Sequence, residues 1–74
     1  MATTKITLTK TPQLVSTGEC YLQSKGGEFF FSFGTTANTS ICFHDYKLYY
    51  NSPFGNVWAW KVVDNEVSLT VAKA

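Results

Sequence analysis

The feature of this sequence that most constrains its fold is a two-residue alternation of apolar and polar side chains, repeated in short runs along the chain. In the final run, EVSLTVAK, the apolar residues Val67, Leu69 and Val71 alternate with polar neighbours. Successive side chains of a β-strand point to opposite faces, so this spacing predicts a strand with one buried face. No segment shows the i, i+3, i+4 spacing of an amphipathic helix. The chain is therefore predicted to be all-β.

Turn residues divide the alternating runs into pieces of strand length. Pro12 ends the first run because it has no amide hydrogen to donate to a ladder, and Thr17-Gly18 precedes ECYLQSK. Lys25-Gly26-Gly27 supplies the positive φ angles of a tight turn, which predicts that the FFFSF run is the return arm of a hairpin with ECYLQSK. The run SICFHDYKLYYN is too long for one strand, and we expect a break near His44-Asp45.

Seven to eight short strands separated by such turns predict one domain over residues 1–74, a compact antiparallel β-sandwich or small barrel. The chain is 45% hydrophobic and only 15% charged, which is a globular composition. A domain of 74 residues buries only about 60–70% of the surface of its unfolded chain, so a stabilising partner is expected.

The expected core consists of the apolar face of each run. Its members are Ile6, Leu8, Leu14, Leu22, Phe29, Phe31, Phe33, Ile41, Phe43, Leu48, Tyr50, Val67, Leu69 and Val71. In NVWAWKVV, we expect the Lys61 side chain to reach water. Alternation from Lys61 then places Trp58, Trp60 and Val62 inward and Val57, Ala59 and Lys61 outward. Cys20 and Cys42 are expected to be free thiols, because the same alternation puts Cys20 on an inner face and Cys42 opposite Ile41 and Phe43.

Several apolar side chains remain on the outer faces. In GEFFFSFG, Phe30 shares the outer face with Ser32 while its three neighbouring phenylalanines point inward. The predicted interface residues are Tyr21, Phe30, Tyr49 and Val57, together with Phe54 on a turn at 52–55. An exposed apolar patch of this kind marks an interaction surface.

Three interpretations of this patch stay open. It can pack on another protein, which would add stability that a small sandwich lacks. It can bind a carbohydrate, with sugar faces on the aromatic rings and hydroxyls bonded by Gln23, Glu28 and Asn51. In the third, the register of the prediction is wrong and the aromatic residues are simply core.

Catalytic and metal-binding chemistry finds little support. The one short constellation is Cys42, His44 and Asp45, and adjacent strand residues point to opposite faces, so His44 and Asp45 should not pair. One histidine and two cysteines lack a paired-ligand spacing such as C-x-x-C. We expect no enzyme activity, no metal and no cofactor.

Nucleic acid and membrane partners are also not expected. The net charge is about +1 and the chain has no arginine, the residue best suited to phosphate. SICFHDYK superficially resembles a strand of cold-shock domains, but the glycine-phenylalanine motif that should precede it reads KGGEFFFSF, with an acid inside. No apolar run suits a spanning helix or a signal peptide, so the expectation is a soluble protein made in the cytoplasm.

The opening TTKITLTKTPQLVSTGECYLQ, the later GNVWAWKV and the closing VSLTVAKA together resemble small all-β proteins encoded among the virion genes of tailed bacteriophages and prophages. The resemblance implies a non-enzymatic structural protein of the virion, a capsid decoration or cement protein or a tail accessory. It also implies many symmetric copies that contact one another or other virion proteins. The FFFSF run and the YKLYY cluster depart from that pattern.

Overall fold

The computed structural model describes residues 2–51 and 55–73, and every helix or strand within them is a β-strand. The strands are three to six residues long. In chain order they are β1 (Ala2–Thr7), β2 (Gln13–Ser16), β3 (Cys20–Lys25), β4 (Phe29–Phe33), β5 (Phe43–Asp45), β6 (Lys47–Tyr50), β7 (Val57–Trp60) and β8 (Ser68–Lys73).

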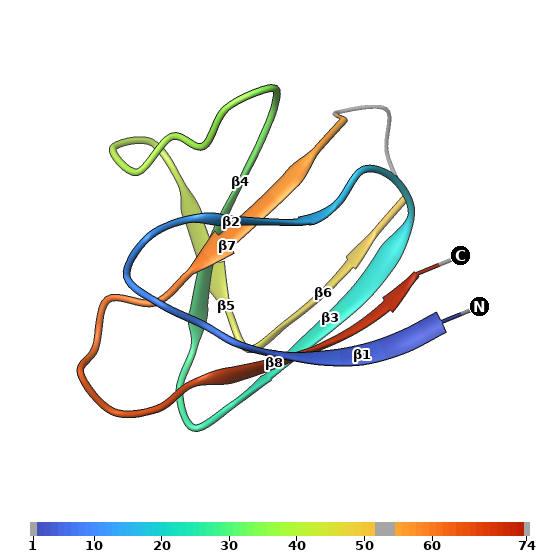
Figure 1. The fold of residues 1–74 in the computed structure, drawn as a ribbon. Helices are drawn as coiled ribbons and strands as arrows, with labels where there is room; N and C mark the ends of the chain where they lie inside the picture. The colour runs from blue at the N-terminus through green and yellow to red at the C-terminus, as the bar shows by residue number, and fades with distance from the viewer. Residues whose placement is uncertain (1, 52–54, 74) are drawn as a thin grey trace.

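These strands form two antiparallel sheets of four. Sheet A has the order β1-β8-β3-β6, and sheet B has the order β2-β7-β4-β5. Figure 1 shows the ends of β1 and β8, and with them the two termini of the chain, side by side at one end of sheet A. The prediction of a compact antiparallel β-sandwich with seven to eight short strands is confirmed.

Each side of the sandwich is crossed by a segment that passes from one sheet to the other. β1 is an edge strand of sheet A and leads into β2 at the edge of sheet B, while β5 leads into β6 with only Tyr46 between them. Backbone bonds hold both crossings, from Lys61 N to Thr9 O at 3.0 Å and from Ser24 N to Tyr46 O at 2.8 Å. The predicted break near His44-Asp45 is confirmed. These crossings connect the edges of the two sheets.

The core fills the space between the two sheets. Its almost completely buried side chains are Leu8, Val15, Cys20, Leu22, Phe29, Val57, Val67, Leu69 and Val71. Stacked rings extend it toward β6, with the Phe33 and Tyr50 centroids 4.9 Å apart. Aromatic pairs of this kind contribute about 0.5–1.5 kcal/mol beyond the area they bury.

The turn at Gly26-Gly27 joins the two sheets and does not close a hairpin. Gly26 has a φ of 97°, as predicted for this turn, and a Cβ there would clash with the carbonyl oxygen of Glu66. β3 pairs with β6 and β8, whereas β4 pairs with β5 and β7. The predicted β3–β4 hairpin is therefore wrong, because separate sheets let Leu22 and Phe29 both bury completely, one from each layer.

The register predicted for β7 is also wrong. Val57 and Ala59 are 0% exposed and lie in the core, directly opposite Phe33 and Phe31 of β4. Small side chains fit against these large rings, whereas two inward tryptophans would overfill the space. Lys61 does not force the opposite register, because it lies beyond β7 and its Nζ donates to the carbonyl oxygen of Asn65 at 2.9 Å.

Four side chains expected in the core are exposed, namely Leu14, Ile41, Phe43 and Val62. Phe43 lies on the core side of sheet B but in the edge strand β5, which leaves more than half of its surface exposed. Leu14 is displaced because the register of β2 against β7 shifts between Leu14 and Ser16, which turns Val15 into the core instead. Ile41 lies in the segment before β5, and Val62 lies beyond the end of β7, so neither side chain is directed by a strand.

Candidate functional site

The outer surface of sheet B carries the apolar side chains that the core does not use. The registers place Phe30 opposite Trp60 and His44, and Trp58 opposite Ser32 and Leu14. These side chains point away from the core because their neighbours Phe31, Ala59 and Val57 point into it. We call this surface the sheet-B face. Its apolar members are Leu14, Phe30, Trp58 and Trp60.

The apolar members of the sheet-B face differ in how much surface they offer. Trp60 is only 3% exposed, so other parts of the chain cover it and it offers little area for contact. Phe30 and Trp58 are half-buried, and Leu14 is 47% exposed. Three strands, β2, β7 and β4, therefore contribute one accessible apolar side chain each.

The loop between β4 and β5 folds against one end of this face. The backbone amide of Asn38 donates to Ser32 Oγ at 3.1 Å, and Trp58 Nε1 donates to the carbonyl oxygen of Gly34 at 2.9 Å. Ser32 is buried although it points outward, because the loop covers it. The second bond fixes the Trp58 ring, so the ring is held ready for contact and loses little freedom on binding.

The same loop presents one further apolar side chain beside the face, that of Ile41. Asn38 Oδ1 accepts hydrogen bonds from the amides of Ser40 and Ile41 at 3.0 and 2.9 Å, which closes a tight turn. Ile41 is 77% exposed as a result. Phe43, the first residue of β5, pairs with Phe31 and stacks on its ring, with centroids 5.7 Å apart, so it lies on the core side of sheet B and not on the sheet-B face, although more than half of its surface is exposed.

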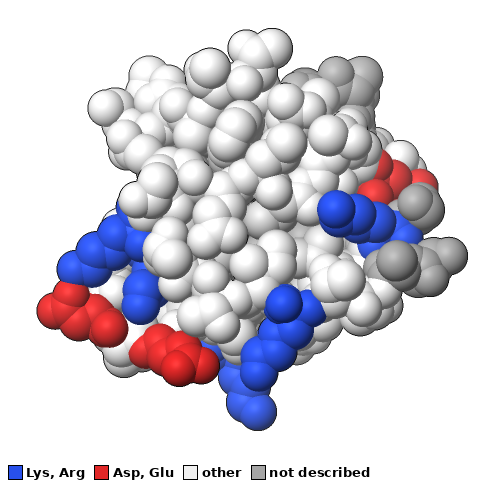
Figure 2. Space-filling model, in the orientation of Figure 1, with Lys and Arg blue, Asp and Glu red and all other residues white. Residues whose placement is uncertain are grey.

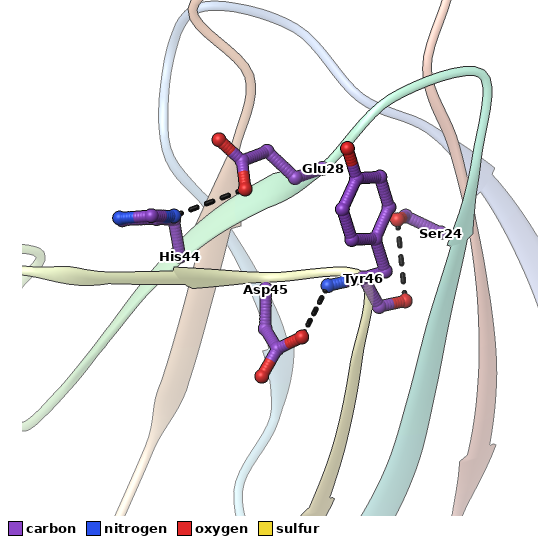
Figure 3. A network of polar contacts seen from close by, with 5 residues as sticks. All are labelled: Ser24, Glu28, His44, Asp45 and Tyr46. Carbon is purple, nitrogen blue, oxygen red and sulfur yellow. Dashed lines mark hydrogen bonds and ion pairs between the residues drawn. The ribbon is translucent and has the colours of Figure 1, made fainter.

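A polar network borders the face along β5, as Figure 3 shows. His44 Nδ1 lies 3.0 Å from Glu28 Oε2, and the His44 ring lies 5.3 Å from that of Phe30. At the neighbouring crossing, Asp45 Oδ1 accepts a hydrogen bond from the Tyr46 amide at 2.7 Å. These contacts hold the β5 edge of sheet B in place, and the charged side chains nearest to the sheet-B face lie along this edge.

Charge is absent from the middle of the face and from the loop beside it. The sequence has no lysine, arginine, aspartate or glutamate from residue 29 to residue 44, or from residue 48 to residue 60. In Figure 2 the charged side chains lie along the lower and right-hand sides, and the upper left part, where Figure 1 places β4 and the following loop, carries none. Contact at this surface would therefore be apolar and not based on ion pairs.

The predicted interface residues do not form a single patch. Tyr21 and Tyr49 are cross-strand partners on the outer face of sheet A, while Phe30 is on the sheet-B face. Val57, predicted to face outward, is completely buried because Val57 and Ala59 form the inner row of β7. Phe54, with most of the turn predicted at 52–55, lies outside the described residues.

The Tyr21–Tyr49 pair is a second surface of interest. The two rings are 44% and 63% exposed, and with Asp45, Lys47 and Leu48 they line an open depression of about 480 Å³. The Tyr49 hydroxyl donates to a carboxylate oxygen of Glu19. This bond, which is made by the neutral phenol, raises the pKa of Tyr49.

The candidate catalytic residues are not brought together. His44 contacts Glu28, Asp45 accepts from the Tyr46 amide, and Cys42 Sγ lies 3.9 Å from the carbonyl oxygen of Thr39. Each polar side chain thus has a partner outside the trio. Cys20 and Cys42 are both free thiols, and burial raises the pKa of Cys20.

Two features are absent from residues 2–51 and 55–73. Within them, no three histidine, cysteine or acidic side chains cluster closely enough to hold a metal ion. That same part of the chain contains no helix of the length and apolarity needed to cross a membrane.

Comparisons with protein-family models, with curated proteins and with solved structures found no significant match to this chain. Sequence reasoning found Phe30 but missed Leu14 and Trp58 as exposed partners. The signal that could have found Trp58 is the long uncharged stretch on both sides of residue 45, which a fully solvated sheet face would not show.

Proposed function

We propose that this protein is a non-enzymatic structural component that assembles by packing its sheet-B face against another protein surface, in the first place the same face of a second copy. The observation that carries the proposal is that sheet B is apolar on both sides, with Phe29 and Phe31 in the core and Phe30 and Trp58 outside. A sheet in a small monomeric protein ordinarily has polar residues on its second face.

A second copy suits this surface because the surface is uncharged. In a twofold symmetric contact each patch meets itself, so any charge at the centre would meet a like charge. The nearest ionic groups, such as Glu28 beside His44, lie at the border of the face. Apolar side chains can pack against identical apolar side chains without electrostatic repulsion.

The three half-exposed side chains alone are too few to hold a dimer. Burying a fully exposed large apolar side chain contributes about 1.5–3 kcal/mol, and Leu14, Phe30 and Trp58 have roughly half of that left to gain. A standard interface covers about 800 Å² of each partner, roughly a sixth of the 4588 Å² that this protein exposes. The proposed contact therefore extends over the loop that carries Ile41.

The setting we propose is a bacteriophage or prophage virion, in which the protein decorates or cements a capsid or serves as a tail accessory after synthesis in the bacterial cytoplasm. Its support is the sequence resemblance of the opening, GNVWAWKV and closing segments. A virion component acts in many symmetric copies, which is the arrangement that a self-complementary face serves.

Sedimentation equilibrium on the wild type, Leu14→Ser and Val63→Ser, at protein concentrations from about 1 μM to 1 mM, tests the self-association. Leu14 and Val63 are similarly exposed, at 47% and 42%, and Val63 lies in the turn between β7 and β8, away from the face. We expect Leu14→Ser to raise the dissociation constant about 30-fold, because each copy loses about 1 kcal/mol of burial. Val63→Ser should leave it unchanged. A wild-type monomer throughout the range, or equal effects of the two substitutions, would contradict the proposal.

A further inference from the structure

The outer face of sheet A carries a compact group of side chains that the proposed assembly does not use. Tyr21 of β3 and Tyr49 of β6 are direct cross-strand partners, and the next pair along the strands is Gln23 with Lys47. Opposite residues of this kind have their Cβ atoms about 4.5–5.5 Å apart, so the two rings lie next to each other. Both rings are substantially exposed.

The two tyrosine rings border an open depression on the outer face of sheet A. It has a volume of about 480 Å³ and is lined by both tyrosines and by Asp45, Lys47 and Leu48. Small-molecule sites typically fall between about 300 and 1,000 Å³ and combine aromatic walls with a few polar groups. The depression has this composition, although it is open to solvent.

The Tyr49 ring is held in place from its hydroxyl end. The hydroxyl donates to a carboxylate oxygen of Glu19. At the other end of the depression, one oxygen of Asp45 is occupied by the Tyr46 amide, which fixes the carboxylate. A ring that is already oriented loses little conformational entropy when a ligand stacks on it.

We propose that the Tyr21–Tyr49 pair binds a neutral saccharide, with a sugar ring stacked on the tyrosines and its hydroxyls bonded by the surrounding side chains. A pyranose has one face of C–H groups, which suits the negative face of an aromatic ring. Its hydroxyls both donate and accept hydrogen bonds, so they can bond to every kind of polar side chain around the rings. Carboxylates only accept, an ammonium only donates, and amides do both. The polar border consists of Glu19, Gln23, Asp45, Lys47 and Asn51.

The charges around the pair favour a neutral ligand. Next to the rings, Glu19 and Asp45 outnumber Lys47, which disfavours a phosphate-bearing ligand there, and the other lysines of this outer face, Lys5 and Lys25, lie farther from the rings. A single-stranded oligonucleotide could also stack on two tyrosines, but its backbone needs a cationic groove that these residues do not supply. The site is independent of the sheet-B face, so its failure and that of the proposed self-association can be told apart.

The test is a panel of neutral oligosaccharides, namely cello-, chito-, malto-, xylo- and mannohexaose, titrated into ¹⁵N-labelled protein and followed by amide chemical shifts. We expect at least one to bind with a dissociation constant of about 1 mM or below and to shift the amides of β3 and β6 around Tyr21 and Tyr49. No shift from any of the five at about 10 mM, a concentration that would nearly saturate such a site, would overturn the proposal.

Variants localise the site. Tyr49→Ala should weaken binding about tenfold or more, whereas Tyr49→Phe, which keeps the ring, should retain most of the affinity. Tyr46→Ala is the matched control, because Tyr46 is 60% exposed and does not line the depression. Equal affinity in Tyr49→Ala and the wild type, with the folded amide spectrum preserved, would refute the site. Salt-sensitive shifts at the same amides with an oligothymidine but none with the saccharides would assign it to nucleic acid instead.

Discussion

The orientation of β7 decides which side chains form the sheet-B face, and it can be tested through the stability of one substitution. Val57 is completely buried opposite Phe33, so Val57→Ala removes about two methylene equivalents from a packed site. Each contributes about 0.8 kcal/mol of transfer free energy, and the cavity left behind adds to the loss. The expected decrease in the free energy of unfolding is about 2–3 kcal/mol, a large fraction of the total for 74 residues.

Val62→Ala is the control, because it makes the same chemical change at an exposed position just beyond β7. Its expected effect is below about 0.5 kcal/mol. Urea unfolding followed by tryptophan fluorescence measures the free energy of unfolding of both variants. In thermal unfolding, the melting temperature of Val57→Ala should fall by about 8–24 °C. If the two substitutions cost the same, Val57 does not lie in the core, and Trp58 and Trp60 do not point outward.

Two further predictions test local features of the fold. Gly26→Ala should lower the free energy of unfolding by about 2–3 kcal/mol, because alanine must adopt a positive φ there and its Cβ would clash with the Glu66 carbonyl oxygen. Gly18→Ala is the control, because a Cβ at this position meets nothing within 4 Å, and it should change the free energy of unfolding by less than about 0.5 kcal/mol. In native protein a thiol reagent should label Cys42 about 10³-fold faster than the buried Cys20, as measured by mass spectrometry of digests; comparable rates would show that Cys20 is not enclosed.

The sequence was sufficient for the fold class because two-residue alternation is a property of each strand alone. Val67, Leu69 and Val71 bury as the alternation of EVSLTVAK predicts, and Phe29 and Phe31 do the same. Turn residues likewise marked real reversals, as at Gly26. These features depend on local chemistry, which the sequence carries directly.

The pairing of the strands was not predictable in the same way. Gly26-Gly27 fits a hairpin turn as well as a passage between sheets, and only the packing of Leu22 and Phe29 from opposite layers distinguishes them. β7 shows the same difficulty, since VWAW is apolar on both faces and its register depends on the size of the Phe31 and Phe33 rings across from it.

The candidate site was only partly predictable for the same reasons. Phe30 was found because its inward neighbours are unambiguous. Leu14 was missed because an extra residue in β2 reverses the alternation, and such a bulge leaves no mark in QLVS. Tyr21 and Tyr49 were found as exposed residues, but their direct pairing is a long-range property of β3 and β6.

The most direct test of the proposed assembly is a dilution series followed by amide and indole chemical shifts, from about 1 mM down to the micromolar range. If copies meet through the sheet-B face, the shifts that depend on concentration should cluster at Leu14, Phe30 and the Trp58 indole, with the outer faces of β1 and β8 unchanged. Spectra that do not change with concentration, or changes confined to sheet A, would contradict the account.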